Sequence, residues 1–540
     1  MLGYHRHGTG IKRATLHLRR ILDPKPVLAH PGPMNNAPPA RLAIWIIVLA
    51  TCFRLIVAFG MGLGIDESYM VAASHRFALS YFDHPFVSWW LELAIRRVTG
   101  AQTPLIVRLP FILVFAGTSF LMYCLTDRLY GARAALWAVI ALTVSPVFSL
   151  AFGTWVLPDG PLDFFLLAAV LAMAKALGIA RPDSGAQPDP KFWLVAGLCI
   201  GLAMDSKYNA ALNLLGALLF LVLDPAARRT LATWRPWAAC LFALALFSPV
   251  LIWNLTHHFA SFDYQGGRAV GFGLYPLRPF IVWAGEALFV LPWIFMPMIV
   301  LMIGGLRRSA DRRARFLATL AVIPVTLFSV VALWSSRKIL YHWAAPGYLM
   351  LFPVLGAWIA GLADRRRQMA KRLAILSAGL LGAAVLFIAA ELNIGIIPGF
   401  NRLFPFGHSP DIQAVDWTSV RATLMRRGLL DQPHFAIAAT RWFNAGKIGY
   451  ALGPAVKVTV FDSDPHEFAF TVPPRSLIGD NILIVGTDGT TKALQAQYAP
   501  LFRSLTIGKP IIIRHHGTPL LRLPVLYGQD LRRWPQPARP

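Results

Sequence analysis

Apolar segments of about twenty residues alternate along this chain with short stretches rich in arginine. A helix needs roughly 20 apolar residues to cross about 30 Å of hydrocarbon. The 540 residues are 56% hydrophobic and only 14% charged, whereas a soluble domain has roughly a quarter of its residues charged. We therefore predict an α-helical polytopic membrane protein with about eleven transmembrane helices. The spans are expected near 41–60, 105–125, 133–152, 161–180, 192–206, 209–223, 236–253, 279–304, 316–334, 343–362 and 373–392.

The arginine-rich stretches predict the orientation, because short basic loops favour the cytoplasmic side of a membrane. Residues 1–40 are expected to form a disordered, basic tail. This tail places the N-terminus on the cytoplasmic side of the cell (inner) membrane. The anionic membrane surface also accounts for the net charge of +25, and nucleic-acid binding is not expected. Arg96 and Arg97 do not fit this pattern, because the topology places them on the external side. We therefore expect a short helix on the outer membrane surface near 86–98, which would hold them at the lipid headgroups. The other predicted cytoplasmic stretches are 126–133, 181–191, 224–235, 307–315 and 365–372.

The composition changes after residue 393, where apolar runs shorten and Gly, Pro and Asp become more frequent. We expect 41–392 to form the transmembrane domain and 393–540 a small α/β domain in the periplasm or an equivalent external space. Residues 441–452 are predicted to form a helix. Strands are predicted at 435–440, 456–461, 468–472, 481–485, 503–507 and 510–514.

Carboxylates gather in the predicted external loops. The first, 61–102, contains Asp66 and Glu67 and then Asp83, and Asp159 lies in the second. Paired acids are costly to desolvate beside a membrane, and a carboxylate beside a sugar hydroxyl can act as a general base. The alternatives are a solvated loop for the first group and a helix N-cap for Asp159, which precedes Pro161.

Basic and aromatic side chains are predicted on the same side. Lys207 interrupts a long apolar run, and it either extends to the interface or binds a phosphate. Adjacent His257 and His258 are either surface residues or ligands. Together these groups favour an anionic ligand at the membrane surface, such as a lipid-linked phosphate with its sugar among the carboxylates. The candidates for phosphate are Lys207, Arg268, Arg337 and Lys338, and those for substrate contacts are Tyr69, Tyr81, His84, Tyr208 and His342.

The order of these motifs resembles bacterial GT-C glycosyltransferases of the dolichyl-phosphate-mannose protein mannosyltransferase superfamily, which includes aminoarabinose transferases acting on lipid A. Members of this superfamily often have Glu-Lys-Pro-Pro where this chain has Asp83-His84-Pro85-Phe86. The resemblance covers roughly 41–350 and is strongest in the first external loop. The motifs are Asp66–Tyr69, Tyr81–Pro85, Pro158–Leu162, Ser206–Tyr208 and Pro249–Asn254.

The resemblance implies sugar transfer from a polyprenyl-phosphate donor to an acceptor outside the membrane, with membrane lipid around both. It implies Asp66 as the catalytic base, with Glu67 second, and Asp83 at the reaction centre. It also implies a divalent metal on Asp83 with His257 or His258. We expect inverting transfer, with Asp159 positioning a substrate. The sugar stays open, as does the acceptor, which could be an envelope glycolipid, a polysaccharide or a protein.

A transporter or flippase for lipid-linked or anionic substrates is the competing interpretation, since a charge such as Lys207 within an apolar run is costly and usually functional. Two equal repeated halves are not evident in the sequence. The paired external carboxylates suit transfer better, and an assembly scaffold would leave them unexplained.

Overall fold

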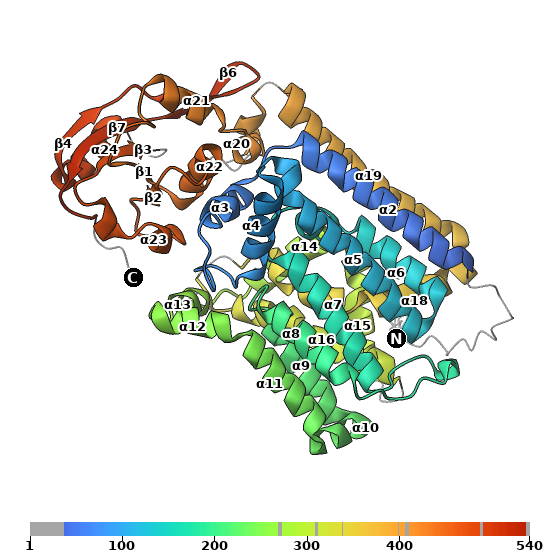
Figure 1. Ribbon diagram of the computed structural model, residues 1–540. Helices are drawn as coiled ribbons and strands as arrows, with labels where there is room; N and C mark the ends of the chain where they lie inside the picture. The colour runs from blue at the N-terminus through green and yellow to red at the C-terminus, as the bar shows by residue number, and fades with distance from the viewer. Residues whose placement is uncertain are drawn as a thin grey trace, which may run out of the picture.

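The computed structural model describes residues 37–267, 273–307, 311–336, 339–397, 399–404, 410–486 and 490–535. Most of the chain is helical, and the predicted spans correspond to helices (Figure 1). The predicted tail lies almost entirely outside the described residues. The helices of the bundle are α2 (Ala37–Gly60), α5 (Pro104–Tyr130), α6 (Ala132–Val144), α7 (Asp159–Ala176), α8 (Phe192–Met204), α9 (Ala210–Leu223), α11 (Trp234–Leu246), α12 (Ser248–Thr256), α14 (Arg278–Val290), α15 (Pro292–Arg307), α16 (Arg312–Val331), α17 (Ala345–Leu349), α18 (Phe352–Arg365) and α19 (Arg367–Ile394).

Among the described residues, four helices, α2, α5, α16 and α19, are long and apolar enough to cross a membrane, and the number rises to 8 if each bent pair is one span. The predicted count of eleven is therefore not reproduced by length and composition. Proline explains two of the breaks, because it removes a backbone donor and its ring clashes with the preceding turn. Pro292 follows a bend of 115° between α14 and α15, and Pro146 precedes a π-helical turn, Val147–Phe152.

The loops predicted to be cytoplasmic lie together at one end of the bundle. Arg181 donates its backbone N–H to the carbonyl of Arg128 at 3.0 Å. Arg312 forms an ion pair with Asp224 at 3.1 Å. These contacts join loops that are distant in the sequence, as the predicted grouping requires.

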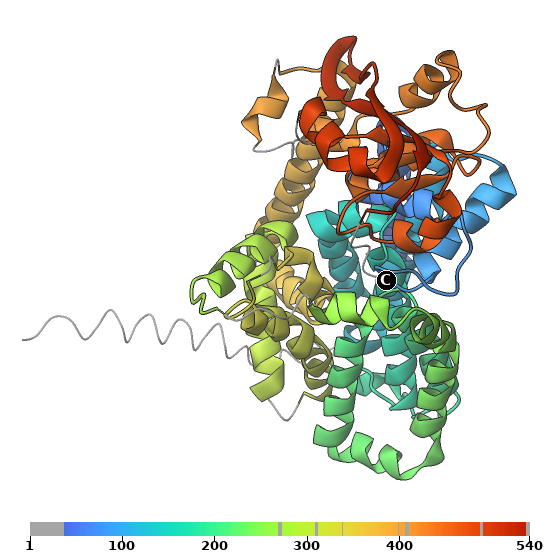
Figure 2. The same ribbon diagram turned by 90° about the vertical axis from the view of Figure 1, so that its left-hand side faces the viewer.

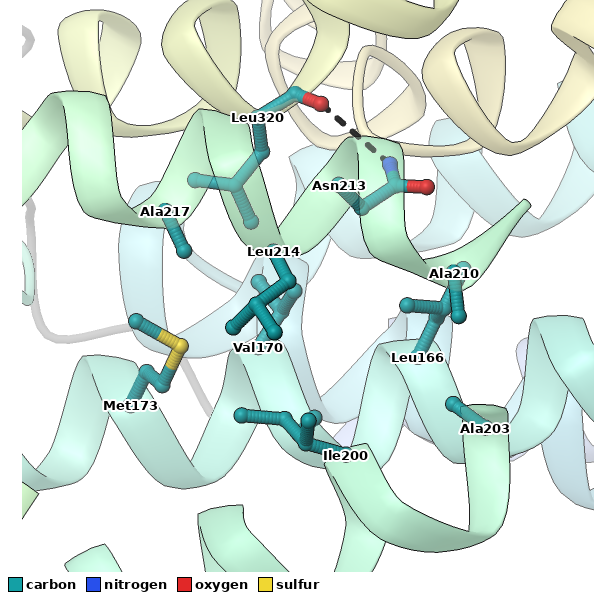
Figure 3. Close-up of a pocket in the computed structure, with 11 residues that line it drawn as sticks. Leu166, Val170, Met173, Ile200, Ala203, Ala210, Asn213, Leu214, Ala217 and Leu320 are labelled. Atoms are coloured by element: carbon teal, nitrogen blue, oxygen red, sulfur yellow. Dashed lines mark hydrogen bonds between the residues drawn. The ribbon is translucent and has the colours of Figure 1, made fainter. Parts of the chain in front are cut away.

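An apolar pocket lies within the bundle between α7, α8, α9 and α16 (Figure 3). Its polar lining residue, Asn213, donates a hydrogen bond to the Leu320 carbonyl at 3.2 Å. The lining contains no ionisable side chain, so this pocket is not suited to acid–base chemistry. The residues are Leu166, Ala169, Val170, Met173, Ile200, Ala203, Ala210, Asn213, Leu214, Ala217 and Leu320.

Two short helices of the first loop lie at the other end of the bundle. The first, α3 (Ile65–Ala73), begins directly after the Gly64 N-cap. The second, α4 (Val87–Thr99), confirms the predicted helix near 86–98. Arg96 bends back to Glu92 of the preceding turn, with 3.3 Å between Nε and Oε1, so one of the two misfit arginines is paired within its own helix.

The C-terminal region contains a five-stranded sheet in the order β2-β1-β3-β7-β4. Strand β1 is parallel to β2 and β3, while β7 is antiparallel to β3 and β4. A separate hairpin pairs β5 with β6. The strands are β1 (Phe435–Ala439), β2 (Val458–Val460), β3 (Asn481–Val485), β4 (Phe502–Ile507), β5 (Ile511–His515), β6 (Thr518–Leu523) and β7 (Val525–Leu531), and the helices beside them include α21 (Ser419–Arg426), α22 (Trp442–Leu452) and α24 (Thr491–Tyr498).

Five of the six predicted strands and the predicted helix are observed, but the prediction of a strand at 468–472 is wrong. Phe468–Thr471 forms a single helical turn, α23. Pro465 and His466 begin this turn by accepting backbone hydrogen bonds from Phe468 and Ala469 at 3.2 and 3.1 Å. The turn is four residues long, and its aromatic rings pack toward the first loop instead of continuing the sheet. The ring centroids of Phe468 and Tyr69 are 5.8 Å apart.

The sheet region and the first loop lie at the same end of the molecule (Figure 2). Helix α22 packs directly on α3. Gly446 permits this contact, because a Cβ atom at that position would lie 2.7 Å from the Tyr69 Cα atom. The C-terminal region therefore covers the loop in which the sequence places its acids.

Candidate active site

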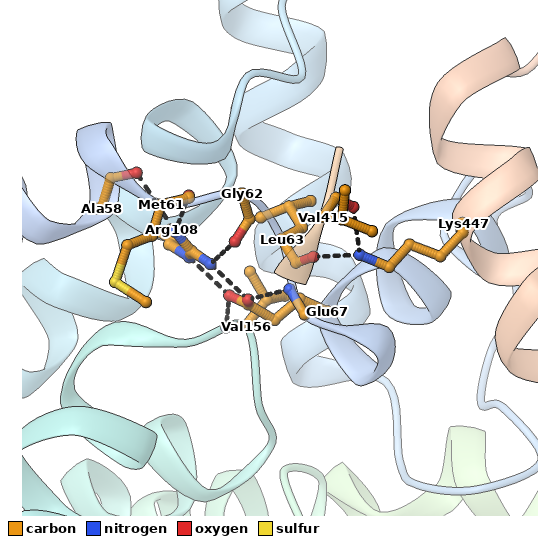
Figure 4. Close-up of polar contacts among 10 residues, drawn as sticks. Ala58, Met61, Gly62, Leu63, Glu67, Arg108, Val156, Val415 and Lys447 are labelled. Atoms are coloured by element: carbon orange, nitrogen blue, oxygen red, sulfur yellow. Dashed lines mark hydrogen bonds and ion pairs between the residues drawn. The ribbon is translucent and has the colours of Figure 1, made fainter. Parts of the chain in front are cut away.

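The two acids at the start of α3 differ in their contacts: Glu67 is buried and hydrogen-bonded, whereas Asp66 is exposed. Glu67 is 4% exposed and accepts two hydrogen bonds from Arg108 of α5, at 2.7 and 2.5 Å. It also accepts the backbone N–H groups of Gly64 at 2.8 Å and Val156 at 3.1 Å (Figure 4). Burial alone would raise the pKa of Glu67, but Arg108 and these hydrogen bonds outweigh it and the pKa is lowered.

Asp66 is exposed and has no hydrogen-bond or ion-pair partner in the part of the chain that the structure describes. Its pKa is raised, first by desolvation and then by the negative charges of Asp83 and Glu67, while the nearby His466 opposes the rise. An accessible carboxylate with a raised pKa is suited to accept a proton.

Asp83 is held by side chains from three parts of the chain. One oxygen accepts a hydrogen bond from the Tyr69 hydroxyl of α3, and the other lies 2.5 Å from Nδ1 of His466. Its backbone carbonyl accepts Gln265 Nε2 of α13 (Ala260–Gly267) at 2.5 Å. Burial raises the pKa of Asp83, but His466 and Tyr69 outweigh burial and lower it, so this carboxylate is an anchored negative charge.

A closed ion pair lies beside this region, at the start of α7. Both oxygens of Asp159 are 2.8 Å from Nζ of Lys207, and the two side chains are 4% and 6% exposed. Asp159 also interacts electrostatically with His342 and His84, and His84 acts on Asp83 as well. The structure therefore brings together residues from four predicted external loops.

The remaining predicted residues contact protein groups or lie outside the described residues. The Tyr81 hydroxyl donates to the Arg76 carbonyl at 3.1 Å, and the Tyr208 hydroxyl is 2.8 Å from Ser261 Oγ. His257 stacks on Trp253 at 4.2 Å between ring centroids, and its neighbour His258 is exposed. The three that fall outside the described residues are Arg268, Arg337 and Lys338.

The expected metal ligands do not assemble in this arrangement. The two carboxylate oxygens of Asp83 contact Tyr69 and His466, and His257 Nδ1 is 2.8 Å from the Trp253 carbonyl. Within the described ranges, no group of three His, Cys, Asp or Glu side chains is placed to hold a metal ion. Metal dependence therefore stays a prediction from the resemblance.

Four residues at this site were not predicted: Arg108, Lys447, His466 and Glu467. Arg108 had a usable signal, since a lone arginine inside an apolar span usually has a buried partner. The other three come from the C-terminal region, where no sequence motif links them to a loop almost 400 residues earlier. The packing of α22 on α3 and the contacts of the segment after β2 with the first loop bring them to the acids.

Comparisons with known proteins support the resemblance inferred from the motifs. Residues 83–253 match the family model for dolichyl-phosphate-mannose-protein mannosyltransferases. The lipopolysaccharide core galacturonosyltransferase RgtB of Rhizobium johnstonii is 26% identical over 214 residues, which are 39% of this chain and 42% of that protein. The lipid A galacturonosyltransferase RgtD of the same organism is 25% identical over 305 residues, 55% of this chain and 60% of that protein. The matched residues thus span about half of each relative.

The fold extends further than the sequence matches. The crystal structure of ArnT from Cupriavidus metallidurans in the apo state superimposes with a TM-score of 0.60 at 15% identity, covering 90% of this chain and 98% of that one. The same protein bound to undecaprenyl phosphate gives a TM-score of 0.58. The chain thus has the fold of ArnT and, over residues 83–253, matches the dolichyl-phosphate-mannose-protein mannosyltransferase family.

Proposed function

We propose that the protein is an integral-membrane glycosyltransferase that moves a sugar from a polyprenyl-phosphate donor to a cell-envelope acceptor. The observation that carries the proposal is Asp66, an accessible carboxylate without a partner in the described chain, beside the anchored acid Asp83. The similarity to galacturonosyltransferases and the fold of ArnT support it.

The proposed reaction is a single displacement with inversion. Asp66 takes the proton of the acceptor hydroxyl while that oxygen forms a bond to the anomeric carbon. The bond from this carbon to the phosphate oxygen breaks, and its electron pair leaves with the polyprenyl phosphate. Because the leaving group is already a stable anion, the reaction needs no strong general acid, and nearby positive charge stabilises it.

The other acids have different proposed roles. The Glu67 carboxylate accepts hydrogen bonds from Arg108 and from two backbone N–H groups, so we assign it to positioning α3 and not to proton transfer. Lys207 provides positive charge near the leaving phosphate while it is held by Asp159. Arg268, Arg337 and Lys338 remain candidates for the same role.

The relatives indicate which substrates to test first. RgtB and RgtD are named for galacturonosyl transfer to lipopolysaccharide core and lipid A. We therefore propose a lipopolysaccharide acceptor and a polyprenyl-phosphate galacturonic acid donor. The proposed location is the inner membrane, with a cytoplasmic N-terminus and with the active site and residues 393–540 in the periplasm.

Turnover by the purified protein in detergent tests this function. Labelled polyprenyl-phosphate sugar and a lipopolysaccharide acceptor are mixed with the protein, and the labelled product is identified by mass spectrometry. A transferase forms product without two compartments. A transporter forms none, and absence of product across a panel of sugar donors and acceptors would overturn the proposal in favour of that alternative.

A further inference from the structure

The C-terminal region supplies one side chain directly to the reaction centre. His466 lies 383 residues after Asp83, yet its Nδ1 atom is 2.5 Å from the Asp83 carboxylate. The two side chains are 8% and 9% exposed. The pair is therefore shielded from solvent, unlike a surface ion pair, which salt screens and which contributes little to stability.

The imidazole of His466 is itself fixed from several sides. Its ring lies against Trp442 of α22, with 4.4 Å between centroids, and its second nitrogen is 3.4 Å from Asp464. The backbone at His466 has a φ of 51°, a left-handed conformation that few residue types adopt readily. The backbone at His466 is therefore strained, and the surrounding contacts hold the ring in this position.

The residue after His466 extends the same contact. The Glu467 backbone N–H donates to the Tyr69 hydroxyl at 2.9 Å, while that hydroxyl donates to Asp83. The Glu467 carboxylate accepts the backbone N–H of Phe82 at 2.7 Å. Two consecutive residues of the C-terminal region thus fix both the side chain of Asp83 and the backbone beside it.

A second contact from the C-terminal region fixes the first loop on the N-terminal side of Asp66. Lys447 of α22 donates to the Leu63 carbonyl at 2.6 Å and to the Val415 carbonyl at 3.2 Å (Figure 4). Leu63 is three residues before Asp66. The C-terminal region therefore holds the loop on both sides of the proposed base.

We infer that His466 is a positioning residue for sugar transfer, which orients the side chains of Asp83 and Tyr69 near Asp66. The inference rests on the proposed function and goes beyond it, because it makes the C-terminal region part of the reaction centre. Without that region, Asp83 would lose its cationic partner and the loop would lose its anchors.

The electrostatics agree with this geometry. Burial lowers the pKa of His466, but Asp83 and Asp464 outweigh burial and raise it to about 10, so the ring is an imidazolium at neutral pH. His466 in turn lowers the pKa of Asp66. The titratable groups around His466 are Asp66, Tyr69, Asp83, Tyr264, Asp464 and Glu467.

Replacement of His466 tests the inference, with His434 as a matched control. His434 also has a positive φ, of 53°, and its Nδ1 is 3.3 Å from Asp480, but it lies in the sheet region with 82% of its side chain exposed. Asn tolerates the left-handed conformation and keeps a neutral donor near Nδ1. We expect His466→Ala to reduce kcat about 100-fold, as misplaced catalytic groups do, with His466→Asn intermediate and His434→Asn unchanged.

Two further readouts separate positioning from a structural effect. Added imidazole should partly restore His466→Ala. The acid limb of kcat/KM should move to higher pH in His466→Asn, because removal of the cation lets the pKa of Asp66 rise further. Melting temperatures in detergent report whether each variant is folded.

Each outcome decides the inference. Full activity in folded His466→Ala overturns the inference. So does loss of activity in folded His466→Asn, if imidazole does not rescue His466→Ala and the acid limb does not shift. If His466→Ala does not fold, His466→Asn decides by its acid limb. If the wild-type protein shows no transfer at all, the proposed function fails instead, so the two failures are distinguishable.

Discussion

The first loop and the start of α7 both present an aspartate at the same end of the bundle, but they hold it in opposite ways. Asp66 is exposed and has no partner in the described chain. Asp159 is 3% exposed and its two oxygens are both bound by Lys207. A saturated carboxylate has little capacity to accept a proton, whereas an open one is available.

The difference assigns proton transfer to Asp66 and electrostatic stabilisation to the Lys207–Asp159 ion pair. Positive charge that is fixed by a buried ion pair can stabilise a phosphate without moving. The proton acceptor must instead remain free to meet the substrate. The two regions together thus provide one base and one electrostatic scaffold, and variants of each should fail in different ways.

The largest expected effect is a loss of turnover when Asp66 of the first loop is replaced. Asp66→Asn should reduce kcat by about 10²–10⁴-fold, the usual contribution of a general base. Its melting temperature should stay near that of the wild type, because Asp66 makes no hydrogen bond or ion pair in the described chain. Turnover and thermal unfolding in detergent check the two parts, and undiminished turnover would remove Asp66 from the mechanism.

Glu67→Gln should act on stability. It leaves Arg108 buried with a neutral partner, and breaking a buried pair costs roughly 3–5 kcal/mol. The free energy of unfolding, measured with denaturant in detergent, checks this. The control is Asp364→Asn, which breaks the exposed pair with Arg133 and should cost about 0–1 kcal/mol. Equal losses in both variants would contradict the distinction.

Lys207→Met should lower both the activity and the stability of the protein, because it removes the ion pair with Asp159. The reaction loses positive charge near the leaving phosphate, and we expect kcat/KM to fall about 10–100-fold. Asp159 is then left buried and uncompensated, so the double variant with Asp159→Asn should be more stable than Lys207→Met alone. A double-mutant cycle of stability measures this coupling, and simple additivity would show that the pair is not energetically linked.

The smallest effect is a shift of pH dependence. The base acts as a carboxylate, so activity should fall as the pH drops through the pKa of Asp66. Desolvation and the charges of Asp83 and Glu67 raise that pKa, so the acid limb should lie above the ordinary aspartate value of about 3.9. A profile of kcat/KM against pH tests this, and a limb at or below the ordinary value would be inconsistent with the geometry.

Much of the fold could be predicted from the sequence, because apolar length and turn residues are local signals. The α22 helix and strands such as β3 are close to their predicted bounds. The number of spans stays a prediction, since breaks such as that before Pro292 divide apolar runs into bent pairs and other apolar helices are short. The prediction of a strand at 468–472 was wrong because so short an apolar segment is compatible with either a strand or a helical turn.

The acids of the site were found because ionisable residues beside apolar spans are costly and stand out. Their partners were harder to find. The Lys207–Asp159 and His466–Asp83 pairs depend on tertiary packing, and nothing local to His466 indicates a contact with the first loop. The sequence interpretation placed Asp83 with His257 or His258, whereas the contact in the structure is with His466.

The stereochemistry of the product tests the central claim most directly. A donor of known anomeric configuration is used in the detergent assay, and the configuration of the transferred sugar is determined by NMR. If Asp66 acts as a base in a single displacement, the product has the opposite configuration. Retention would instead require two displacements, with a carboxylate such as Asp66 forming a covalent bond to the sugar, and would contradict the proposed role.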